Sequence, residues 1–301
     1  MNDRVDLHMH SSYSSDADHS VCELLQMARD LKLDAISIAD HDAVKGSQIA
    51  AACCQDYGLE VLPNVEITTF FQGRELHILS YFIDLNATEV LKQLAEIRAF
   101  DEARIAGIVV RLNELGIDVT YEETKALCPH AAPKSSVLAK AVMTNGRNHR
   151  LALLQPYFEG CRSDQPFHNF SRDTMRPGGI AYVEPALRYS TIEAIKLVRD
   201  HGGIPILAHP AGSLSCPKEM HIIDTLRTHD LCGLEVYSSY HSEADEILLE
   251  QYCAHHGLAV TAGSDFHGPT VKPQIRMGEV RHNPYSLVER LKEKRRIVNP
   301  V

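Results

Sequence analysis

The sequence predicts an α/β fold in which parallel strands alternate with helices. Two observations predict it: short apolar runs recur along the chain, and amphipathic stretches of helical periodicity separate them. A third is that this alternation stops in the middle of the chain and resumes towards the C-terminus. Because strand, helix and strand in succession form a parallel sheet, both ends of the chain are expected to build one barrel-like body.

The N-terminal part supplies the first strands and helices of this body. The apolar runs "VDL", "AISIA" and "EVLPNV" are separated by helical patterns over residues 20–31 and 43–57. The first helix opens with a capping box, in which the side chains of Ser20 and Glu23 satisfy backbone N–H groups at the helix start. Ser190 and Glu193 repeat this signal before a helix that ends near Asp200.

The C-terminal part repeats the rhythm. The runs "GIPILA", "GLEVY" and "LAVTAGS" alternate with predicted helices over residues 220–228, 243–256 and 285–294. Together with "ELHILSYF", the chain then holds seven predicted strands.

The middle of the chain is expected to form a separate unit. Residues 98–184 read as an inserted helical cap, with residues 1–97 and 185–301 forming the β/α barrel. Within the insertion, residues 162–179 are polar and contain Pro and Gly. Residues 162–176 of this stretch are predicted to lack regular structure.

Charge and hydropathy restrict the class of partner. Thirty Lys and Arg residues against forty Asp and Glu residues give a net charge of -10, which disfavours binding to long nucleic acids. No run approaches the roughly 20 apolar residues that span a bilayer. A cytoplasmic protein with no membrane contact is expected, and the sequence leaves its oligomeric state open.

Histidines and acids gather where the predicted strands end. If the strands are parallel, these ends share one rim, which is where such folds place their active sites. The residues concerned are His8, His10, Asp40, His41, Glu66, His77, His209, Asp265 and His267.

This pattern predicts a site for several metal ions. His8 and His10 are two residues apart on an extended backbone, so both imidazoles project to the same face, and the same holds for Asp265 and His267. Each residue alone is more often a hydrogen-bonded structural group, but so many buried polar groups together are costly unless they are paired or bound to metal. Six histidines and three carboxylates suit two or three ions, with manganese first and iron or zinc as alternatives.

The motifs that carry these residues resemble a known family. "DLHMHSSYSSDA", "SIADHDAVKG", "NVEIT", "ELHILSYF", "ILAHP" and "GSDFHGP" are similar, in order, to motifs of the PHP (polymerase and histidinol phosphatase) phosphoesterases of the amidohydrolase superfamily. They cover residues 5–84 and 180–270. The layout is most similar to members with a helical insertion that act on nucleotide 3′-phosphates, short RNA ends or cyclic sugar phosphates.

The resemblance implies a distorted seven-stranded β/α barrel with a trinuclear metal cluster. The first ion would be held by His8, His10, Glu66 and Asp265, the second by Glu66, His77 and His209, and the third by Asp16, His41 and His267. Some relatives carry a histidine in place of Asp16, a change that should alter the affinity or identity of the third ion.

The expected chemistry is in-line attack on phosphorus by a hydroxide that the first two ions share. Asp265 and His209 count as catalytic through the ions they hold. Asp40 and His241 are the candidates for protonating the leaving group or contacting the substrate. For phosphate recognition the candidates are Lys134, Arg147, Arg172 and Arg176 in the insertion, together with His241. Relatives usually carry an Arg-x-His motif where this chain reads "PKSSVLAKAV", so Lys134 would replace the arginine.

Three functions remain open at this stage. The first is a metal-dependent phosphoesterase for a small metabolite, such as a nucleotide bisphosphate or a cyclic sugar phosphate. The second is a 5′-3′ exonuclease on short RNA or DNA, which needs a basic, aromatic-lined groove in the insertion. The third is a non-catalytic regulatory or proofreading module, which would be expected to have lost some ligands.

Overall fold

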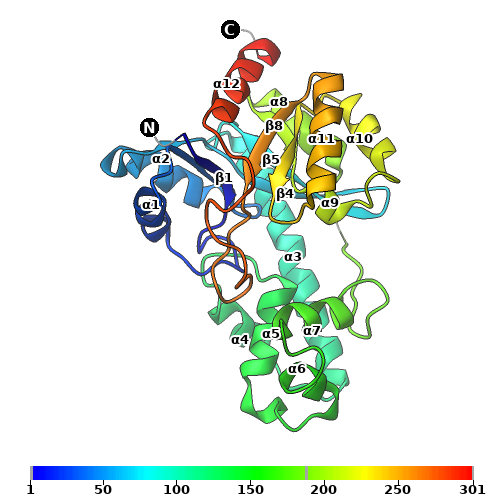
Figure 1. The fold of residues 1–301 in the computed structure, drawn as a ribbon. Coiled ribbons are helices and arrows are strands. Elements are labelled where there is room, and N and C mark those ends of the chain that lie inside the picture. The colour runs from blue at the N-terminus through cyan, green and yellow to red at the C-terminus, as the bar shows by residue number, and fades with distance from the viewer. Residues whose placement is uncertain (1–2, 187–188, 300–301) are drawn as a thin grey trace.

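The computed structural model of the chain describes residues 3–186 and 189–299. Within this part the strands form two sheets, three-stranded in the order β1-β2-β3 and five-stranded in the order β4-β5-β6-β7-β8 (Figure 1). The strands are β1 Val5–Met9, β2 Ala35–Ile38, β3 Glu60–Val61, β4 Glu66–Phe71, β5 Arg74–Tyr81, β6 Ile204–Leu207, β7 Gly233–Ser238 and β8 Ala259–Gly263. The α/β class predicted from the sequence is confirmed.

The predicted closed (β/α)7 barrel is not confirmed. In the described part of the chain the β-bridges between the two sheets are isolated ones, from Met9 to Phe266 and from His41 to Glu66, and no continuous ladder joins the sheets. The parallel pairing expected from the sequence holds for β1 to β3 and for β6 to β8. β5 instead runs antiparallel to both β4 and β6, because β4 and β5 form a hairpin.

Helices surround the two sheets. They are α1 Val21–Asp30, α2 Lys45–Tyr57, α8 Thr191–Asp200, α9 Pro210–Ser213, α10 Met220–Arg227, α11 Glu243–His256 and α12 Ser286–Val298. The capping box at Ser20 and Glu23 is confirmed. The one predicted at Ser190 is wrong, since that side chain makes no capping hydrogen bond.

A helical unit, the predicted cap, is connected to this body through α3 (Figure 1). It comprises part of α3 Thr88–Glu114, then α4 Tyr121–Ala126, α5 Ser135–Thr144, α6 Gln155–Phe158 and α7 Pro166–Met175. The prediction that residues 162–176 lack regular structure is wrong, because α7 lies there and buries Phe170 and Met175. None of the described helices is long and apolar enough to cross a membrane.

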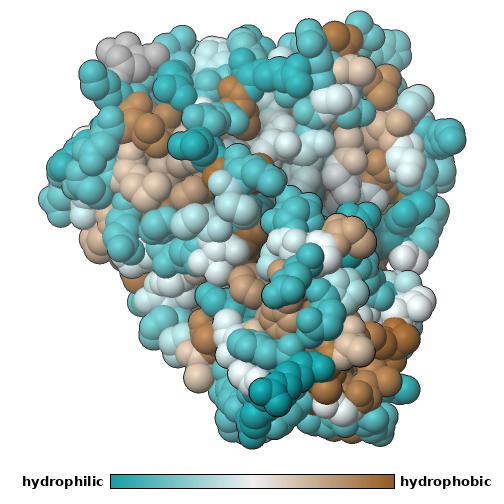
Figure 2. All heavy atoms as spheres, turned by 60° about the horizontal axis from the view of Figure 1, so that its bottom comes forward, coloured by the Kyte–Doolittle hydropathy of each residue, from teal (hydrophilic) through white to brown (hydrophobic). Residues whose placement is uncertain are grey.

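The body and the helical unit have separate hydrophobic cores, and α3 contributes to both. Val90 and Leu94, in its first half, pack into the core of the body. Ile108 and Leu112, in its second half, pack against α5 and α7 in the other core. The boundary predicted after residue 97 therefore falls inside one continuous helix. Viewed from the cap side, the surface is mainly hydrophilic, with hydrophobic residues in separate groups (Figure 2).

Candidate metal centre

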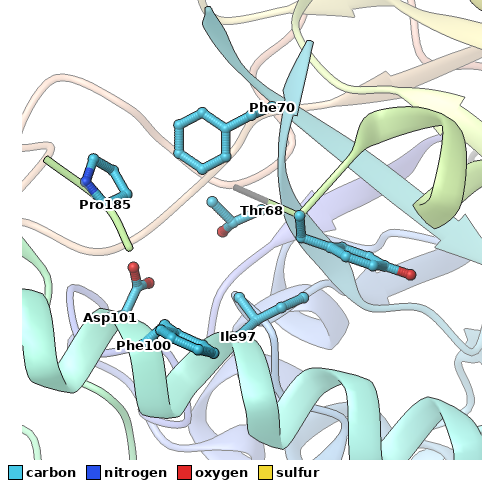
Figure 3. Close-up of a pocket in the computed structure, with 7 residues that line it drawn as sticks. Thr68, Phe70, Ile97, Phe100, Asp101 and Pro185 are labelled. Atoms are coloured by element: carbon cyan, nitrogen blue, oxygen red, sulfur yellow. The ribbon is translucent and has the colours of Figure 1, made fainter. Parts of the chain in front are cut away.

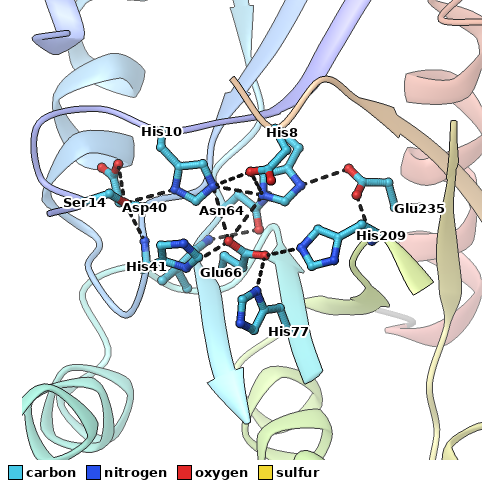
Figure 4. A network of polar contacts seen from close by, with 12 residues as sticks. His8, His10, Ser14, Asp40, His41, Asn64, Glu66, His77, His209 and Glu235 are labelled. Atoms are coloured by element: carbon cyan, nitrogen blue, oxygen red, sulfur yellow. Dashed lines mark hydrogen bonds and ion pairs between the residues drawn. The ribbon is translucent and has the colours of Figure 1, made fainter. Parts of the chain in front are cut away.

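Glu66 lies at the middle of a buried cluster of histidines (Figure 4). Its Oε2 atom is 3.3 Å from Nε2 of His8, 3.3 Å from Nε2 of His10 and 3.0 Å from Nδ1 of His41. Its Oε1 atom is 2.9 Å from Nδ1 of His77 and 3.1 Å from Nε2 of His209. One carboxylate thus contacts five imidazoles that come from both sheets.

Two of these residues reach the cluster by a route that differs from the prediction. Glu66 does not end the run "EVLPNV": β3 stops at Val61, and Glu66 is the first residue of β4. His77 lies within the antiparallel strand β5. Pro63 explains the break, because proline has no N–H to donate to a sheet ladder.

Asp265 closes the cluster on the side of β8. Its Oδ1 atom is 2.9 Å from Nε2 of His10 and 3.4 Å from Nε2 of His8. Asp265 and His209 both have positive φ angles, 55° and 28°, although neither is glycine. Such conformations are costly and persist at functional sites, where the surrounding structure enforces them.

A third group lies beside the first two. His267 stacks on His10, with ring centroids 4.0 Å apart, and its Nε2 atom is 3.7 Å from Oδ1 of Asp16. All nine predicted ligands are therefore in one cluster. Converging donor atoms within 4.8 Å of one another form three sets: His8, His10, Glu66 and Asp265; His41, Glu66 and His77; and His10, His41 and His267. The first set equals the one predicted for the first ion, while the division of the other ligands between ions stays a prediction.

The donor set fits divalent metal ions. Five buried atoms in the cluster make no hydrogen bond of suitable geometry, although some lie within 3.0 Å of another cluster atom: Oδ1 of Asp16, Nδ1 of His41, Oε2 of Glu66, Oδ1 of Asp265 and Nε2 of His267. Leaving such atoms unpaired in a protein interior costs about 1 to 3 kcal/mol each. Imidazole and carboxylate donors that point at a common centre satisfy this need when they bind cations of the Mn, Fe or Zn type.

The charges in the cluster shift the ionisation of its members. Burial alone would raise the pKa of Glu66, but the charges of His8, His41 and His77 hold that pKa well below its usual value. Burial opposes protonation of His77, yet Glu66 and Glu75 raise its pKa to about 10. Glu66 is thus held in its anionic form by the histidines around it.

Glu235 and Ser14 orient the first two histidines, and the sequence reasoning missed both. Nδ1 of His8 is 3.0 Å from Oε1 of Glu235, and Nδ1 of His10 is 2.9 Å from Oγ of Ser14. If each Nδ1 carries the proton, both Nε2 lone pairs face the cluster, as metal ligation requires. Glu235 also accepts a 2.9 Å hydrogen bond from the backbone N–H of His209. The signal available in the sequence was a single acid within the apolar run "GLEVY".

Asp40 is connected to the cluster through Ser14, which contacts His10. It is fully buried and accepts hydrogen bonds from the backbone N–H and the hydroxyl of Ser11 and from the hydroxyl of Ser14. Burial raises its pKa to about 6, although His10 and these serines oppose the rise. Gly46 leaves the space for this carboxylate, because a Cβ there would be 1.9 Å from Oδ2 of Asp40.

His241 is held by backbone groups. Its Nδ1 atom is 2.7 Å from the carbonyl oxygen of Val236, and its Nε2 atom accepts a 3.2 Å hydrogen bond from the N–H of Ala211. Its predicted role in proton transfer or substrate contact would require one of these bonds to break.

Lys134 joins the cap to the body. Its ammonium group is 2.7 Å from Asp101 of α3 and 3.6 Å from Asp42, the residue after His41. Asp101 and Thr68 line a small cavity of about 10 Å³ between α3 and β4 (Figure 3). The predicted phosphate contact of Lys134 would compete with these acids.

The three predicted arginines differ in how close they lie to the cluster. Arg176 is 3.1 Å from Glu75, whose other oxygen is 3.7 Å from Nε2 of His77. Arg172 is exposed on α7. Arg147 is 62% exposed and pairs with Asp118 and Glu123 of the cap. Of the three, the contacts link only Arg176 to the cluster through a single residue, within the described part of the chain.

The family follows from a direct comparison. A sequence profile of the PHP domain matches residues 6–161, more than half of the 301 residues. The chain belongs to the PHP domain family, and the resemblance noted in its motifs is confirmed.

Curated relatives cover nearly the whole chain. A 5′-3′ exoribonuclease of Haemophilus influenzae is 27% identical over 271 residues, which span 89% of this chain and 92% of the relative. A phosphoribosyl 1,2-cyclic phosphate 1,2-diphosphodiesterase of Eggerthella lenta is 25% identical, over 87% of this chain and 94% of the relative. A 3′,5′-nucleoside bisphosphate phosphatase of Chromobacterium violaceum is 24% identical, over 88% and 87%.

Solved structures share the fold. A Bifidobacterium adolescentis protein proposed to be a metal-dependent phosphoesterase superimposes with a TM-score of 0.79 at 25% identity, covering 98% of this chain and 97% of the other. An amidohydrolase from Chromobacterium violaceum, solved with bound sulfate and no metal, has a TM-score of 0.80 at 23% identity, over 97% and 96%. The cap is thus part of a fold that other chains share over their full length.

Proposed function

We propose that the protein is a metal-dependent phosphoesterase that hydrolyses a small phosphorylated metabolite. The observation that carries this proposal is the buried cluster around Glu66, in which five atoms lack hydrogen-bond partners. The protein is a hydrolase of phosphoester bonds, as predicted, since it belongs to the PHP family and its relatives are named for that chemistry.

The nine clustered side chains would hold two or three ions, with manganese first and iron or zinc as alternatives. Such ions neutralise phosphoryl oxygens and lower the pKa of a bound water, which are the two needs of phosphate ester hydrolysis. The protein's own part is to hold the ligands in place: Glu235 and Ser14 orient His8 and His10. Arg176, near His77, is the favoured cap residue for binding a phosphoryl oxygen.

Asp40 and His241 are the two candidates that we propose for donating a proton to the leaving group. Asp40, whose pKa burial raises to about 6, hydrogen-bonds to Ser14, and Ser14 contacts the ligand His10. His241 would first have to release a backbone partner.

The substrate is inferred from the relatives and from charge. Nucleoside bisphosphates and cyclic sugar phosphates are small anions, and the Chromobacterium violaceum and Eggerthella lenta relatives are named for them. A net charge of -10 repels long polyanions but leaves a local cationic site free to bind a small one. The inserted unit, residues 98–184 by prediction, would select among such substrates.

A second candidate is 5′-3′ trimming of short RNA. The Haemophilus influenzae relative and a 26% identical relative from Escherichia coli are both named as 5′-3′ exoribonucleases. The non-catalytic module is not favoured, because all nine predicted ligands are present and clustered.

One experiment separates these functions. The protein is purified without chelator, loaded with Mn²⁺, and assayed with a nucleoside 3′,5′-bisphosphate, a ribosyl 1,2-cyclic phosphate and a 5′-phosphorylated short RNA. The Asp265→Asn variant, checked for folding by circular dichroism, serves as control and should lose at least about a hundredfold in rate, typical for the loss of a charge-stabilising group. If that variant hydrolyses the preferred substrate as fast as wild type, the site is wrongly assigned.

A further inference from the structure

The loop after β8 carries a lysine that no sequence pattern singled out. Lys272 places its ammonium nitrogen 2.5 Å from Oδ2 of Asp265 and 5.1 Å from the centre of the Tyr240 ring. Tyr240 in turn contacts His209, with ring centroids 5.1 Å apart. Lys272 therefore lies at the edge of the metal centre, next to two of its predicted ligands.

The loop is fixed at both ends, so this position is not that of a free surface side chain. The N–H of Thr270 donates a 2.7 Å hydrogen bond to Asp18, and the N–H of Gly278 donates a 2.7 Å hydrogen bond to the buried Asp6. Gly268 has a φ of 96°, and a Cβ added there would lie 2.5 Å from Oδ2 of Asp18. Gln274 joins the loop to Gln165 at the start of the cap helix α7.

The two oxygens of Asp265 face different partners. Oδ1 faces His8 and His10 inside the cluster, and Oδ2 faces Lys272. When Oδ1 binds a metal ion, the carboxylate lies between the ion and the ammonium group, and its single negative charge does not neutralise both. The net positive charge that remains attracts a further anion. An anionic substrate at the metal centre supplies that anion.

The ammonium group also has donors left for such a substrate. An ammonium group has three N–H donors; Asp265 accepts from one, the Tyr240 side chain interacts with a second, and a third is left. The side chain remains 21% exposed, so it still reaches the solvent.

Lys272 and two arginines of the cap act on the same histidine. Partial burial lowers the pKa of His168 on α7, and the nearby charges of Arg172, Arg176 and Lys272 lower it further. The hydrogen bond between Gln165 and Gln274 likewise places the loop next to the cap.

We propose that Lys272 binds the phosphoryl group of the substrate, donating hydrogen bonds to an oxygen of a phosphate held at the metal centre. This proposal rests on the proposed function and adds a specificity residue from the body of the protein rather than from the cap. Lys272 selects for substrates that present a free anionic oxygen on the side of Asp265.

The test compares Lys272→Met and Lys272→Arg with a matched control, Lys292→Met. Lys292 has the same kind of surroundings, an acid at 2.6 Å (Glu60) and an aromatic ring at 5.7 Å (Tyr285), but neither partner belongs to the cluster. Binding of inorganic phosphate to the Mn²⁺-loaded proteins is measured by calorimetry, and metal per chain by elemental analysis.

Lys272→Met should bind phosphate at least about tenfold more weakly, the effect of losing one charge-assisted hydrogen bond, with its metal content unchanged. Lys272→Arg should keep much of the affinity, and Lys292→Met all of it. Equal phosphate affinity in Lys272→Met and wild type, a loss of metal in Lys272→Met, or no phosphate binding by loaded wild type would each overturn the proposal. If wild type binds phosphate more tightly than Lys272→Met but hydrolyses no phosphoester, the proposed function fails, and the role of Lys272 is reduced to binding phosphate.

Discussion

At the residue scale, two buried glutamates organise the candidate metal centre, one inside the cluster and one outside it. Glu66 contacts His8, His10, His41, His77 and His209 directly. Glu235 stays outside the cluster and holds His8 through Nδ1 and His209 through its backbone. The backbone of His209 is strained at a φ of 28°, so one carboxylate fixes a ligand from β1 and a strained ligand after β6.

We predict that Glu235→Gln weakens metal binding without unfolding the protein. An amide can either donate to or accept from Nδ1 of His8, so the ring is no longer held with Nε2 free for the metal. Loss of such an outer partner costs about 10 to 100-fold in metal affinity. Competition with a fluorescent chelator measures it. Glu246→Gln, at a buried glutamate that pairs with Arg281 away from the cluster, should keep wild-type affinity; equal affinity in both variants would contradict the role of Glu235.

We also predict that Gly46→Ala destabilises the protein. Its Cβ would lie 1.9 Å from Oδ2 of Asp40 and 2.6 Å from Oγ of Ser11, and both belong to one buried network. Forcing such groups apart costs about 1 to 3 kcal/mol of unfolding free energy. Urea unfolding of the chelated protein measures it. Gly146→Ala, which has open space around its Cβ, is the control, and equal midpoints for the two variants would show that the crowding relaxes without cost.

At the element scale, the local periodicity predicted most helices of the body but not the β4–β5 hairpin. The signals for α1 and α11 lie within each segment: a capping serine, an acid three residues later and an apolar face. The direction of β5 depends on its partners β4 and β6, which the segment itself does not encode. The run "EVLPNV" looked like one strand because its apolar pattern is continuous, whereas Pro63 divides it.

The same contrast explains the site. His8 with His10, and Asp265 with His267, were predictable because each pair is spaced two residues apart near the end of a recognisable strand. Glu235 and Lys272 act through partners 227 and 7 residues away, and only the folded chain brings the first of these pairs together. Lys272 lies in an irregular loop, where no periodicity marks the direction of a side chain.

For the junction between α3 and the body, we predict that Lys134→Met lowers stability. The substitution leaves Asp101 and Asp42 without their shared cation where cap and body meet. Because the lysine side chain is 24% exposed, solvent screening limits the loss of unfolding free energy to about 1 to 2 kcal/mol. Thermal unfolding measures this loss, with Lys140→Met, within the helix α5 that follows Lys134, as control. A double variant Lys134→Met, Asp101→Asn should recover part of the loss, and an unchanged midpoint in the single variant would refute the idea.

At the scale of the whole molecule, the centre ties the two sheets together. His8, His10 and His41 come from the three-stranded sheet or its ends, whereas Glu66 and His77 come from the other sheet. In the described residues no continuous β-ladder joins the sheets, although they share isolated bridges and a hydrophobic core that includes Leu7 and Leu79. Ions bound by both sets of ligands would therefore act as a clamp between sheets.

We accordingly predict that chelation lowers the thermal midpoint of wild type and that Mn²⁺ restores it. A ligand present at 100 times its dissociation constant stabilises the native state by about 2.7 kcal/mol. Scanning calorimetry with and without a chelator measures the shift. The Glu66→Gln variant should respond little to either treatment, and an equal response in that variant would place the stabilising ion elsewhere.

The most direct test of the account is the anomalous diffraction of crystals grown with Mn²⁺. We predict at least two strong anomalous peaks inside the cluster. One should be bounded by His8, His10, Glu66 and Asp265, and another should lie next to Glu66 and His77. This prediction is contradicted if the cluster shows no peak under saturating Mn²⁺, or if the manganese binds only at sites that exclude Glu66.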